Sequence, residues 1–130
     1  MRILLAEDDF VTRKFMMNFL SKYGECDVTV DGMEAVDAFM MALEEDEPYD
    51  LVCLDIMMPV MDGYQALQGI RNLEQERNIE GDKAVKVIMA TALNDEKNVK
   101  MAFDLGCTIY SGKPIDQARF EQALKKLGLV

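Results

Sequence analysis

The chain alternates short apolar runs with longer stretches in which apolar residues recur at helical spacing. Two of the runs, Leu51–Leu54 and Val85–Ala90, are nearly unbroken, which is typical of strands buried on both faces of a parallel sheet. Together the runs predict five strands, at Ile3–Ala6, Val28–Val30, Leu51–Leu54, Val85–Ala90 and Thr108–Tyr110.

Five amphipathic stretches, one after each run, predict helices. Their apolar residues are Phe15, Met16, Phe19 and Leu20; Val36, Phe39, Met40 and Leu43; Tyr64, Leu67, Ile70 and Leu73; Val99, Ala102 and Phe103; and Phe120, Ala123, Leu124 and Leu127. Capping residues predict where these helices begin and end. The starts are Asp31-Gly32, Asp62-Gly63 and Asn94, and the ends are Gly24, Gly106 and Gly128.

Strands that alternate with helices favour a parallel sheet covered on both faces. The prediction is one α/β domain over residues 1–130, a (βα)5 doubly wound fold. Its five-stranded parallel sheet has the flavodoxin-like strand order 2-1-3-4-5. Two segments are less regular. The second strand, within Cys26–Val30, carries two polar residues, and Gln75–Lys86 either extends the third helix or forms an exposed loop.

Composition narrows the class of protein. The chain has 130 residues, of which 50% are apolar, as in a globular domain. The net charge of −10 and the pI near 4.4 disfavour binding to nucleic acid or to anionic membranes. The apolar run before Glu7 is too short for a signal peptide or a membrane span, so a cytoplasmic location is expected.

Three residue types add to this picture. The chain contains no histidine, so any phosphohistidine in its chemistry must come from a partner. Cys26, Cys53 and Cys107 are widely spaced and predict reduced thiols and no zinc site. The eleven methionines fall mainly in the apolar phases of the helices and are interpreted as flexible core filler.

Polar residues follow or close the predicted strands at one edge of the sheet. Glu7-Asp8-Asp9 follows the first strand, Asp55 the third, Thr91 the fourth and Lys113 the fifth. Ligands of open α/β sheets bind at the carboxyl ends of the strands, where the strand order reverses. With the order 2-1-3-4-5 that point lies between the first and third strands, so Asp8 and Asp55 are expected to converge.

Several carboxylates in one cleft repel one another unless a cation compensates. A few oxygen ligands, with room for water and phosphate oxygens, suit Mg²⁺, and the chain lacks the residue spacing of a calcium-binding loop. Asp55 could then attack phosphorus and form an acyl phosphate, with Lys113 neutralising the product. Taken singly, each signal has a plain explanation: a helix start, a cap or a turn. Their coincidence at one edge favours the chemical interpretation.

Four motifs resemble those of the receiver domains of bacterial two-component response regulators. They are Ile3-Leu4-Leu5-Ala6-Glu7-Asp8-Asp9, Asp55-Ile56-Met57-Met58-Pro59-Val60-Met61-Asp62-Gly63, Ala90-Thr91-Ala92 and Lys113-Pro114-Ile115. The resemblance spans essentially the whole chain in the right order. Because no further domain follows in the sequence, the chain resembles single-domain regulators of the chemotaxis or phosphorelay type.

The resemblance implies a role for each residue of the site. Asp55 would be the phosphoacceptor, and Thr91 and Lys113 would contact the phosphoryl group. Asp8, Asp55 and the Met57 carbonyl would bind Mg²⁺ directly, whereas Glu7 would bind it through a water and Asp9 would not be a ligand. Tyr110 would be the aromatic switch residue, coupled to Thr91, and the Lys113–Pro114 bond would be cis.

Two positions depart from the family's pattern. Met57, two residues after the phosphoacceptor, and Leu93, two residues after the conserved hydroxyl, are apolar where the family often carries polar side chains. The corresponding positions tune water attack on the acyl phosphate. We expect the two apolar side chains to orient water poorly and to prolong the life of the phosphoryl group.

The resemblance also implies a function. The chain would accept a phosphoryl group on Asp55 from a histidine kinase or phosphotransfer protein and change its affinity for a target protein. It would catalyse only its own phosphorylation and slow dephosphorylation. A relay that passes the group onward is the alternative. In either case the partner surface is expected on the fourth helix, fifth strand and fifth helix, near Tyr110.

Three other classes fit less well. A haloacid-dehalogenase-type phosphatase needs a second aspartate two residues after the first, where this chain has Met57. A flavin-binding module needs a glycine- and hydroxyl-rich phosphate loop, and Glu7-Asp8-Asp9 has the wrong charge for one. A degenerate receiver that serves only as an interaction module would lack Asp55, Asp8 or Lys113, and all three are present.

Overall fold

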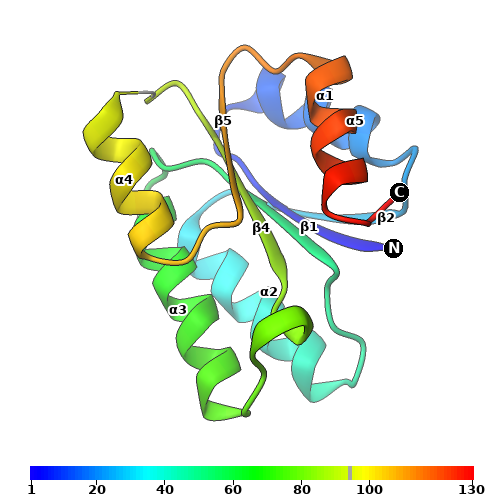
Figure 1. Cartoon of the computed structure of the whole chain (residues 1–130), viewed down its shortest axis with the longest axis vertical. Helices are drawn as coiled ribbons and strands as arrows, with labels where there is room; N and C mark the ends of the chain where they lie inside the picture. Colours follow the sequence, from blue (N-terminus) through cyan, green and yellow to red (C-terminus); the bar gives the residue numbers. More distant parts are fainter. Residues whose placement is uncertain (94) are drawn as a thin grey trace.

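A computed structural model describes residues 1–93 and 95–130. In this part of the chain five parallel strands form one sheet in the order β2-β1-β3-β4-β5, which confirms the predicted fold and strand order (Figure 1). The elements are β1 (Arg2–Ala6), α1 (Phe10–Leu20), β2 (Glu25–Thr29), α2 (Gly32–Glu44), β3 (Leu51–Leu54), α3 (Gly63–Glu76), the 3-10 helix η1 (Gly81–Lys83), β4 (Lys86–Thr91), α4 (Glu96–Asp104), β5 (Ile109–Gly112) and α5 (Gln117–Lys126).

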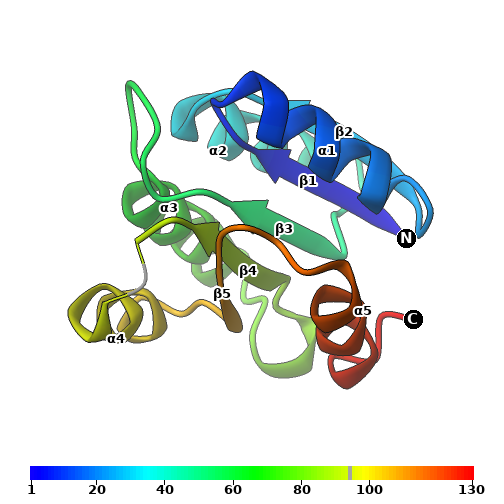
Figure 2. The same ribbon diagram turned by 90° about the horizontal axis from the view of Figure 1, so that it is seen from above.

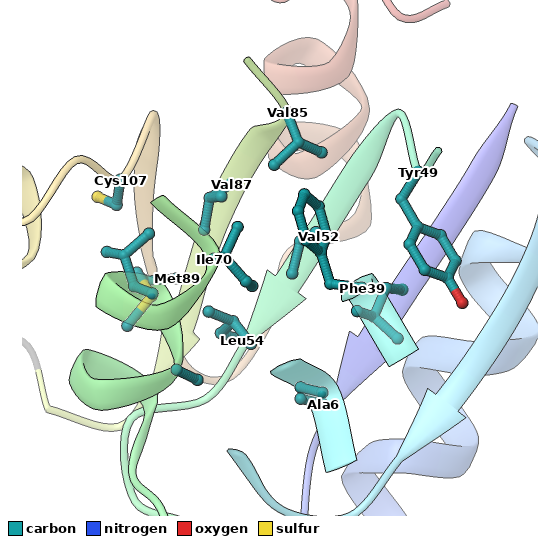
Figure 3. Packing of buried hydrophobic residues seen from close by; sticks show 14 of the residues in the cluster. Ala6, Phe39, Tyr49, Val52, Leu54, Ile70, Val85, Val87, Met89 and Cys107 are labelled. Carbon is teal, nitrogen blue, oxygen red and sulfur yellow. The ribbon is translucent and has the colours of Figure 1, made fainter. Parts of the chain in front are cut away.

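Helices cover both faces of the sheet because successive strand residues point to opposite faces. Leu4 and Val52 belong to a core cluster under α2, α3 and α4, part of which Figure 3 shows. Their neighbours Ile3 and Leu51 belong to a second cluster under α1 and α5. In Figure 1, α1 and α5 accordingly lie on one side of the sheet and α2, α3 and α4 on the other. Strand β3, buried throughout, lies between the two layers.

Aspartate caps begin the helices largely as predicted. The Asp31 and Asp62 side chains accept hydrogen bonds from backbone amides in the first turns of α2 and α3. Asn94, the predicted start of the fourth helix, lies outside the described residues; the side chain that caps α4 is that of Asp95, which accepts from the Asn98 amide. Gly106 and Gly128 follow α4 and α5 with positive φ, which confirms the predicted ends.

Gly24 does not end a helix, so that prediction was wrong. Helix α1 ends at Leu20, and Ser21 is its C-cap. Gly24 instead allows the chain to pass close to the N-terminus: a Cβ atom there would lie 2.0 Å from the Met1 carbonyl oxygen. The next residue, Glu25, donates its amide to that oxygen as β2 begins to pair with β1.

The irregular segment between the third helix and the fourth strand is mostly loop. Helix α3 extends only to Glu76, and η1 follows before β4 begins at Lys86. Of the two alternatives for Gln75–Lys86, the structure therefore supports the loop. Strand β2 forms one edge of the sheet, which explains its polar residues, since an edge strand is less covered than a central one.

The interpretation of the methionines as core filler was wrong for about half of them. Met16 and Met89 are fully buried, but five methionines are exposed: Met17, Met33, Met41, Met57 and Met101. All three cysteines carry free thiols, and Cys53 and Cys107 are buried. Among the described residues, none of the helices has the length and apolar character needed to cross a membrane.

Candidate functional site

The first and third strands end side by side, and this places two acidic residues at one edge of the sheet. Ala6 pairs with Leu54 across the β1–β3 ladder, and the amide of Asp55 donates to the Ala6 carbonyl over 3.1 Å. Glu7 and Asp55 therefore leave neighbouring strands at the same level. Figure 2 shows the arrowheads of β1, β3 and β4 at this common edge.

Three carboxylates gather there and form an acidic cluster, defined as Glu7, Asp8 and Asp55. One ligand atom from each lies within 4.8 Å of the others, as sequence reasoning expected. Glu7 and Asp55 are buried, at 2% and 8% exposure, whereas Asp8 is open to solvent. Such a cluster can bind a divalent cation through oxygen atoms alone.

Lys113 reaches the acidic cluster from the end of β5. Its ammonium donates to Asp55 Oδ2 over 2.9 Å and also to Glu7 Oε1. One ammonium thus faces three carboxylates, and an excess of negative charge remains in the site when all of them are ionised. This excess attracts cations.

Burial and this excess of charge change the protonation of the site. Burial, with a further contribution from the Asp55 charge, raises the pKa of Glu7 to about 7, although the hydrogen bond from Lys113 opposes the shift. Burial alone would lower the pKa of Lys113, but its hydrogen bonds to Glu7 and Asp55 outweigh burial and raise it. Lys113 is therefore a fixed positive charge near neutral pH.

Asp55 retains an oxygen atom for chemistry. Its Oδ1 is buried and has no hydrogen-bond partner among the residues that the structure describes. Buried carboxylate oxygens are nearly always paired, so an unpaired one at the centre of an acidic cluster fits a metal ion or a reacting group. The donor set and this oxygen together fit a small hard cation such as Mg²⁺.

Thr91 and Tyr110 lie on the two adjacent strands. Thr91 closes β4, is 1% exposed, and accepts a hydrogen bond from the Leu93 amide on its hydroxyl. Its carbonyl accepts from the Lys113 amide, which joins it to the acidic cluster. The Tyr110 hydroxyl, in β5, is buried and without a partner in the described part of the chain. Burial, with the neighbouring Tyr64, raises the pKa of Tyr110 to about 12.

The remaining predicted positions lie around the acidic cluster. Asp9 caps α1, accepting from the Thr12 amide over 2.9 Å, and does not belong to the cluster. The Met57 side chain is 63% exposed, and Leu93 packs against the core as a partly buried residue. The Lys113–Pro114 bond is cis, which confirms the expectation drawn from the family resemblance.

Two residues that shape the site were missed from the sequence. Arg13, in α1, donates through Nη1 to the carbonyl oxygens of Glu7 and Asp8, over 3.0 and 3.1 Å. Gly63 lets α3 begin directly against the end of β3, since a Cβ there would lie 2.2 Å from the Asp55 carbonyl oxygen. The available signals were an arginine in the first turn of the helix that follows the acidic pair, and a glycine directly after the Asp62 cap.

Comparisons with known proteins agree with this geometry. The family model of the response regulator receiver domain matches residues 3–125. The chain is 34% identical to the chemotaxis protein CheY of Treponema pallidum over 120 residues, which cover 91% of this chain and 76% of that protein. The chain therefore belongs to the response regulator receiver domain family, whose members are regulatory.

Solved structures agree as well. The chain resembles the structure of a CheX–CheY complex of Borrelia burgdorferi that contains BeF3 and magnesium, with a TM-score of 0.82 and 29% identity, covering 98% of this chain and 88% of that one. It also resembles the receiver domain of the sensor histidine kinase PA1611 of Pseudomonas aeruginosa, with magnesium coordinated in its active-site cleft. That match has a TM-score of 0.79 and 27% identity, over 97% and 95% of the two chains.

Several relatives are much longer than this chain. It is 32% identical to the probable histidine kinase 2 of Oryza sativa over 95% of its own length but only 12% of that protein. In other curated relatives the chain spans still smaller fractions, such as 5% of the histidine protein kinase 1 of Candida albicans. The receiver domain is thus shared by short regulators and by long kinases.

Proposed function

We propose that this chain is a cytoplasmic phospho-switch in which Asp55 accepts a phosphoryl group from a phosphohistidine of a partner kinase or phosphotransfer protein. The observation that carries the proposal is the environment of the Asp55 carboxylate. One oxygen accepts a hydrogen bond from Lys113 at 2.9 Å, and the other, within the acidic cluster, is buried and unpaired among the described residues.

The transfer exchanges one bond for another. An Asp55 carboxylate oxygen attacks phosphorus in line; the bond between phosphorus and the donor imidazole nitrogen breaks, and the imidazole leaves with the electron pair of that bond. The product is an acyl phosphate on Asp55. The donor histidine comes from the partner because this chain has none.

The site residues have separate roles in this proposal. Asp8, Asp55 and the Met57 carbonyl would hold Mg²⁺ directly, and Glu7 would hold it through water. When bound, the ion offsets the repulsion between Asp55 and the incoming phosphoryl oxygens. Lys113 pairs with the charge of the product, and the Thr91 hydroxyl donates to a phosphoryl oxygen. The support is the 4.8 Å grouping of the carboxylates and the burial of Thr91 beside Lys113.

The phosphoryl group acts by shifting an existing conformational equilibrium. Once Thr91 turns toward the phosphoryl group, space and hydrogen-bond partners near Tyr110 change, and the face built by α4, β5 and α5 changes its affinity for a target. A shift of a few kcal/mol suffices, which one or two charge-assisted hydrogen bonds can supply. The unpaired Tyr110 hydroxyl supports this, because a rearrangement that satisfies it recovers a desolvation cost of about 1–3 kcal/mol.

A phosphorelay role is the second candidate. Its support is the occurrence of the same domain as a small part of long histidine kinases, such as the 12% of the Oryza sativa relative. In that case Asp55 passes the phosphoryl group to a second histidine protein. The two roles share all steps up to the acyl phosphate.

The deciding experiment uses acetyl phosphate, a small phosphodonor, with and without Mg²⁺, and reads the intact mass of the chain. We expect a gain of one phosphoryl group that requires Mg²⁺ and is absent in Asp55→Asn. A gain that is missing, independent of Mg²⁺ or retained in Asp55→Asn overturns the proposal. Incubating the labelled chain with histidine phosphotransfer proteins separates the switch role from the relay role. Only a relay is expected to pass its label to such a protein as fast as the chain itself becomes phosphorylated.

A further inference from the structure

The side chain of Arg13 folds back from α1 beneath the loop that carries two of the acidic residues. Its Nη1 donates to the carbonyl oxygens of Glu7 and Asp8, over 3.0 and 3.1 Å. The guanidinium lies 5.6 Å from the centre of the Phe10 ring, which limits its movement further. Arg13 is half-buried, unlike the exposed Lys14 beside it.

Holding two consecutive carbonyls on one donor restricts the backbone between them. The peptide that joins Glu7 to Asp8 and the one that follows Asp8 must both turn toward Arg13. The directions of the two side chains then depend on side-chain rotation alone. On the β2 side, the Glu7 amide is fixed by the Thr29 carbonyl at 3.1 Å, so the loop is held from two directions.

This restraint acts against a force that is present before any cation binds. The three carboxylates of the acidic cluster lie within 4.8 Å of one another, and Glu7 and Asp55 are buried. Lys113 compensates Glu7 and Asp55 but makes no hydrogen bond to Asp8 among the described residues. Repulsion therefore favours a movement of the Asp8 loop into solvent, and the Arg13 hydrogen bonds oppose it.

We propose that Arg13 is a positioning residue for the divalent cation: it preorganises Glu7 and Asp8 through their backbone carbonyls. The inference rests on the proposed function, because it concerns the same metal site. Arg13 does not contact the cation. Outer groups that fix the orientation of ligands typically change metal affinity by about 10- to 100-fold when removed.

Because Arg13 is positively charged, its effect on Mg²⁺ affinity has opposite signs for charge and for positioning. A positive charge near a cation site weakens cation binding through Coulomb repulsion. If charge alone mattered, the loss of Arg13 would tighten Mg²⁺ binding. If positioning dominates, its loss weakens binding despite the relief of repulsion.

The experiment measures the Mg²⁺ dissociation constant of the unphosphorylated chain by calorimetric titration. We expect Arg13→Met, which keeps the apolar stem, to raise this constant about 10-fold. Arg13→Lys, which keeps the charge and a single donor nitrogen, is expected to restore part of the affinity. The matched control is Lys14→Met, which removes the same charge from the next residue of α1 and leaves binding unchanged or slightly tighter.

Other measurements keep the result interpretable. Thermal unfolding without Mg²⁺ shows whether Arg13→Met is folded. If it is not, Phe10→Ala replaces it, because this change frees the guanidinium without removing its charge and is expected to weaken Mg²⁺ binding by less than the loss of Arg13 itself. An unchanged or tighter constant in the folded variant overturns the inference. A wild-type chain that binds no Mg²⁺ overturns the proposed metal site as well, whereas normal Mg²⁺ binding without phosphorylation overturns the proposed function alone.

Discussion

Two clusters of charged residues lie at opposite ends of the strands, one at the amino-terminal edge of the sheet and one at the carboxyl edge. Only in the first are the charges balanced and the carboxylate oxygens all hydrogen-bonded. At the amino-terminal edge, Arg71 of α3 pairs with the buried Glu74 at 2.7 Å. The other Glu74 oxygen accepts from the Val85 amide at 2.6 Å, and Arg71 donates to the carbonyls of Gly106 and Val85. One positive charge meets one negative charge, and each oxygen of the carboxylate has a partner.

At the carboxyl edge, the acidic cluster holds three carboxylates against the single ammonium of Lys113. Here the pKa of Glu7 is raised to about 7, chiefly by burial, and Asp55 Oδ1 has no partner among the described residues. Both clusters are polar and largely buried, so burial alone does not distinguish them. The difference lies in what is left unsatisfied.

This comparison separates a structural role from a chemical one. The Arg71–Glu74 pair joins α3 to the loops before β4 and β5, and each oxygen of its carboxylate already accepts a hydrogen bond. The acidic cluster keeps excess charge and, among the residues that the structure describes, one carboxylate oxygen without a hydrogen-bond partner, at a cost in stability that a bound cation can offset. Substitutions at the two edges should therefore affect different properties of the protein.

The largest expected effect is the loss of phosphorylation in Asp55→Asn. Labelling by acetyl phosphate should fall below detection, because the amide cannot act as the nucleophile. The free energy of unfolding of the metal-free chain, measured with urea, should stay the same or rise by about 1 kcal/mol as repulsion in the cluster falls. A marked loss of stability would show that Asp55 is a structural residue like Glu74.

The opposite result is expected for Glu74→Gln. The change leaves Arg71 without its counter-charge and should lower the free energy of unfolding by about 3 kcal/mol. Phosphorylation of the folded protein should stay within about twofold of the wild-type rate. Asp104→Asn is a matched control, since it removes the exposed partner of Lys100 and should cost about 0.5 kcal/mol or less. If Glu74→Gln and Asp104→Asn lowered the free energy of unfolding equally, the Arg71–Glu74 pair would not have the structural role assigned to it.

The next largest effect is expected in the pH dependence of the free energy of unfolding, to which Glu7 of the acidic cluster contributes. Because the pKa of Glu7 rises from 4.5 to about 7 on folding, the folded state binds more protons than the unfolded state between these values. The contribution of Glu7 to the free energy of unfolding is thus fully present below pH 4.5 and is lost as the pH rises through about 7, and it amounts to about 3 kcal/mol. Urea unfolding of the metal-free chain from pH 5 to pH 8 measures this loss. Glu7→Gln should not show this loss of stability. If the wild-type chain and Glu7→Gln had the same pH profile, the protonation of Glu7 would not be its cause.

The smallest expected effect concerns the rate at which the acyl phosphate is lost. If apolar side chains at Met57 and Leu93 leave attacking water poorly oriented, Met57→Asn should shorten the lifetime of the phosphoryl group several-fold, equivalent to about 1 kcal/mol. Release of label from the purified phosphoprotein measures it. Met41→Asn, at another exposed methionine far along α2, is the control and should leave the lifetime unchanged. An unchanged lifetime in Met57→Asn would exclude a role for that side chain.

Local sequence signals predicted much of the fold. The unbroken apolar runs around β3 and β4 identified buried parallel strands, and the aspartates before α2 and α3 identified helix starts. Gly24 shows the limit of such signals, because a glycine that permits a close approach to Met1 looks the same in sequence as one that ends a helix. The methionines show another limit, since their flexible side chains suit both core and surface.

The sequence by itself determined which chemical groups are present, their order along the strands and hence the family. The tertiary structure alone decided how these groups compensate one another. Lys113 meets Glu7 across 106 positions and Asp55 across 58, and Arg71 meets Gly106 across 35. Hydrogen bonds, burial and pKa values depend on distances between such remote residues. For that reason the acidic residues of the site could be named from the sequence, whereas the raised pKa of Glu7, the restraint by Arg13 and the satisfied pair at the opposite edge could not.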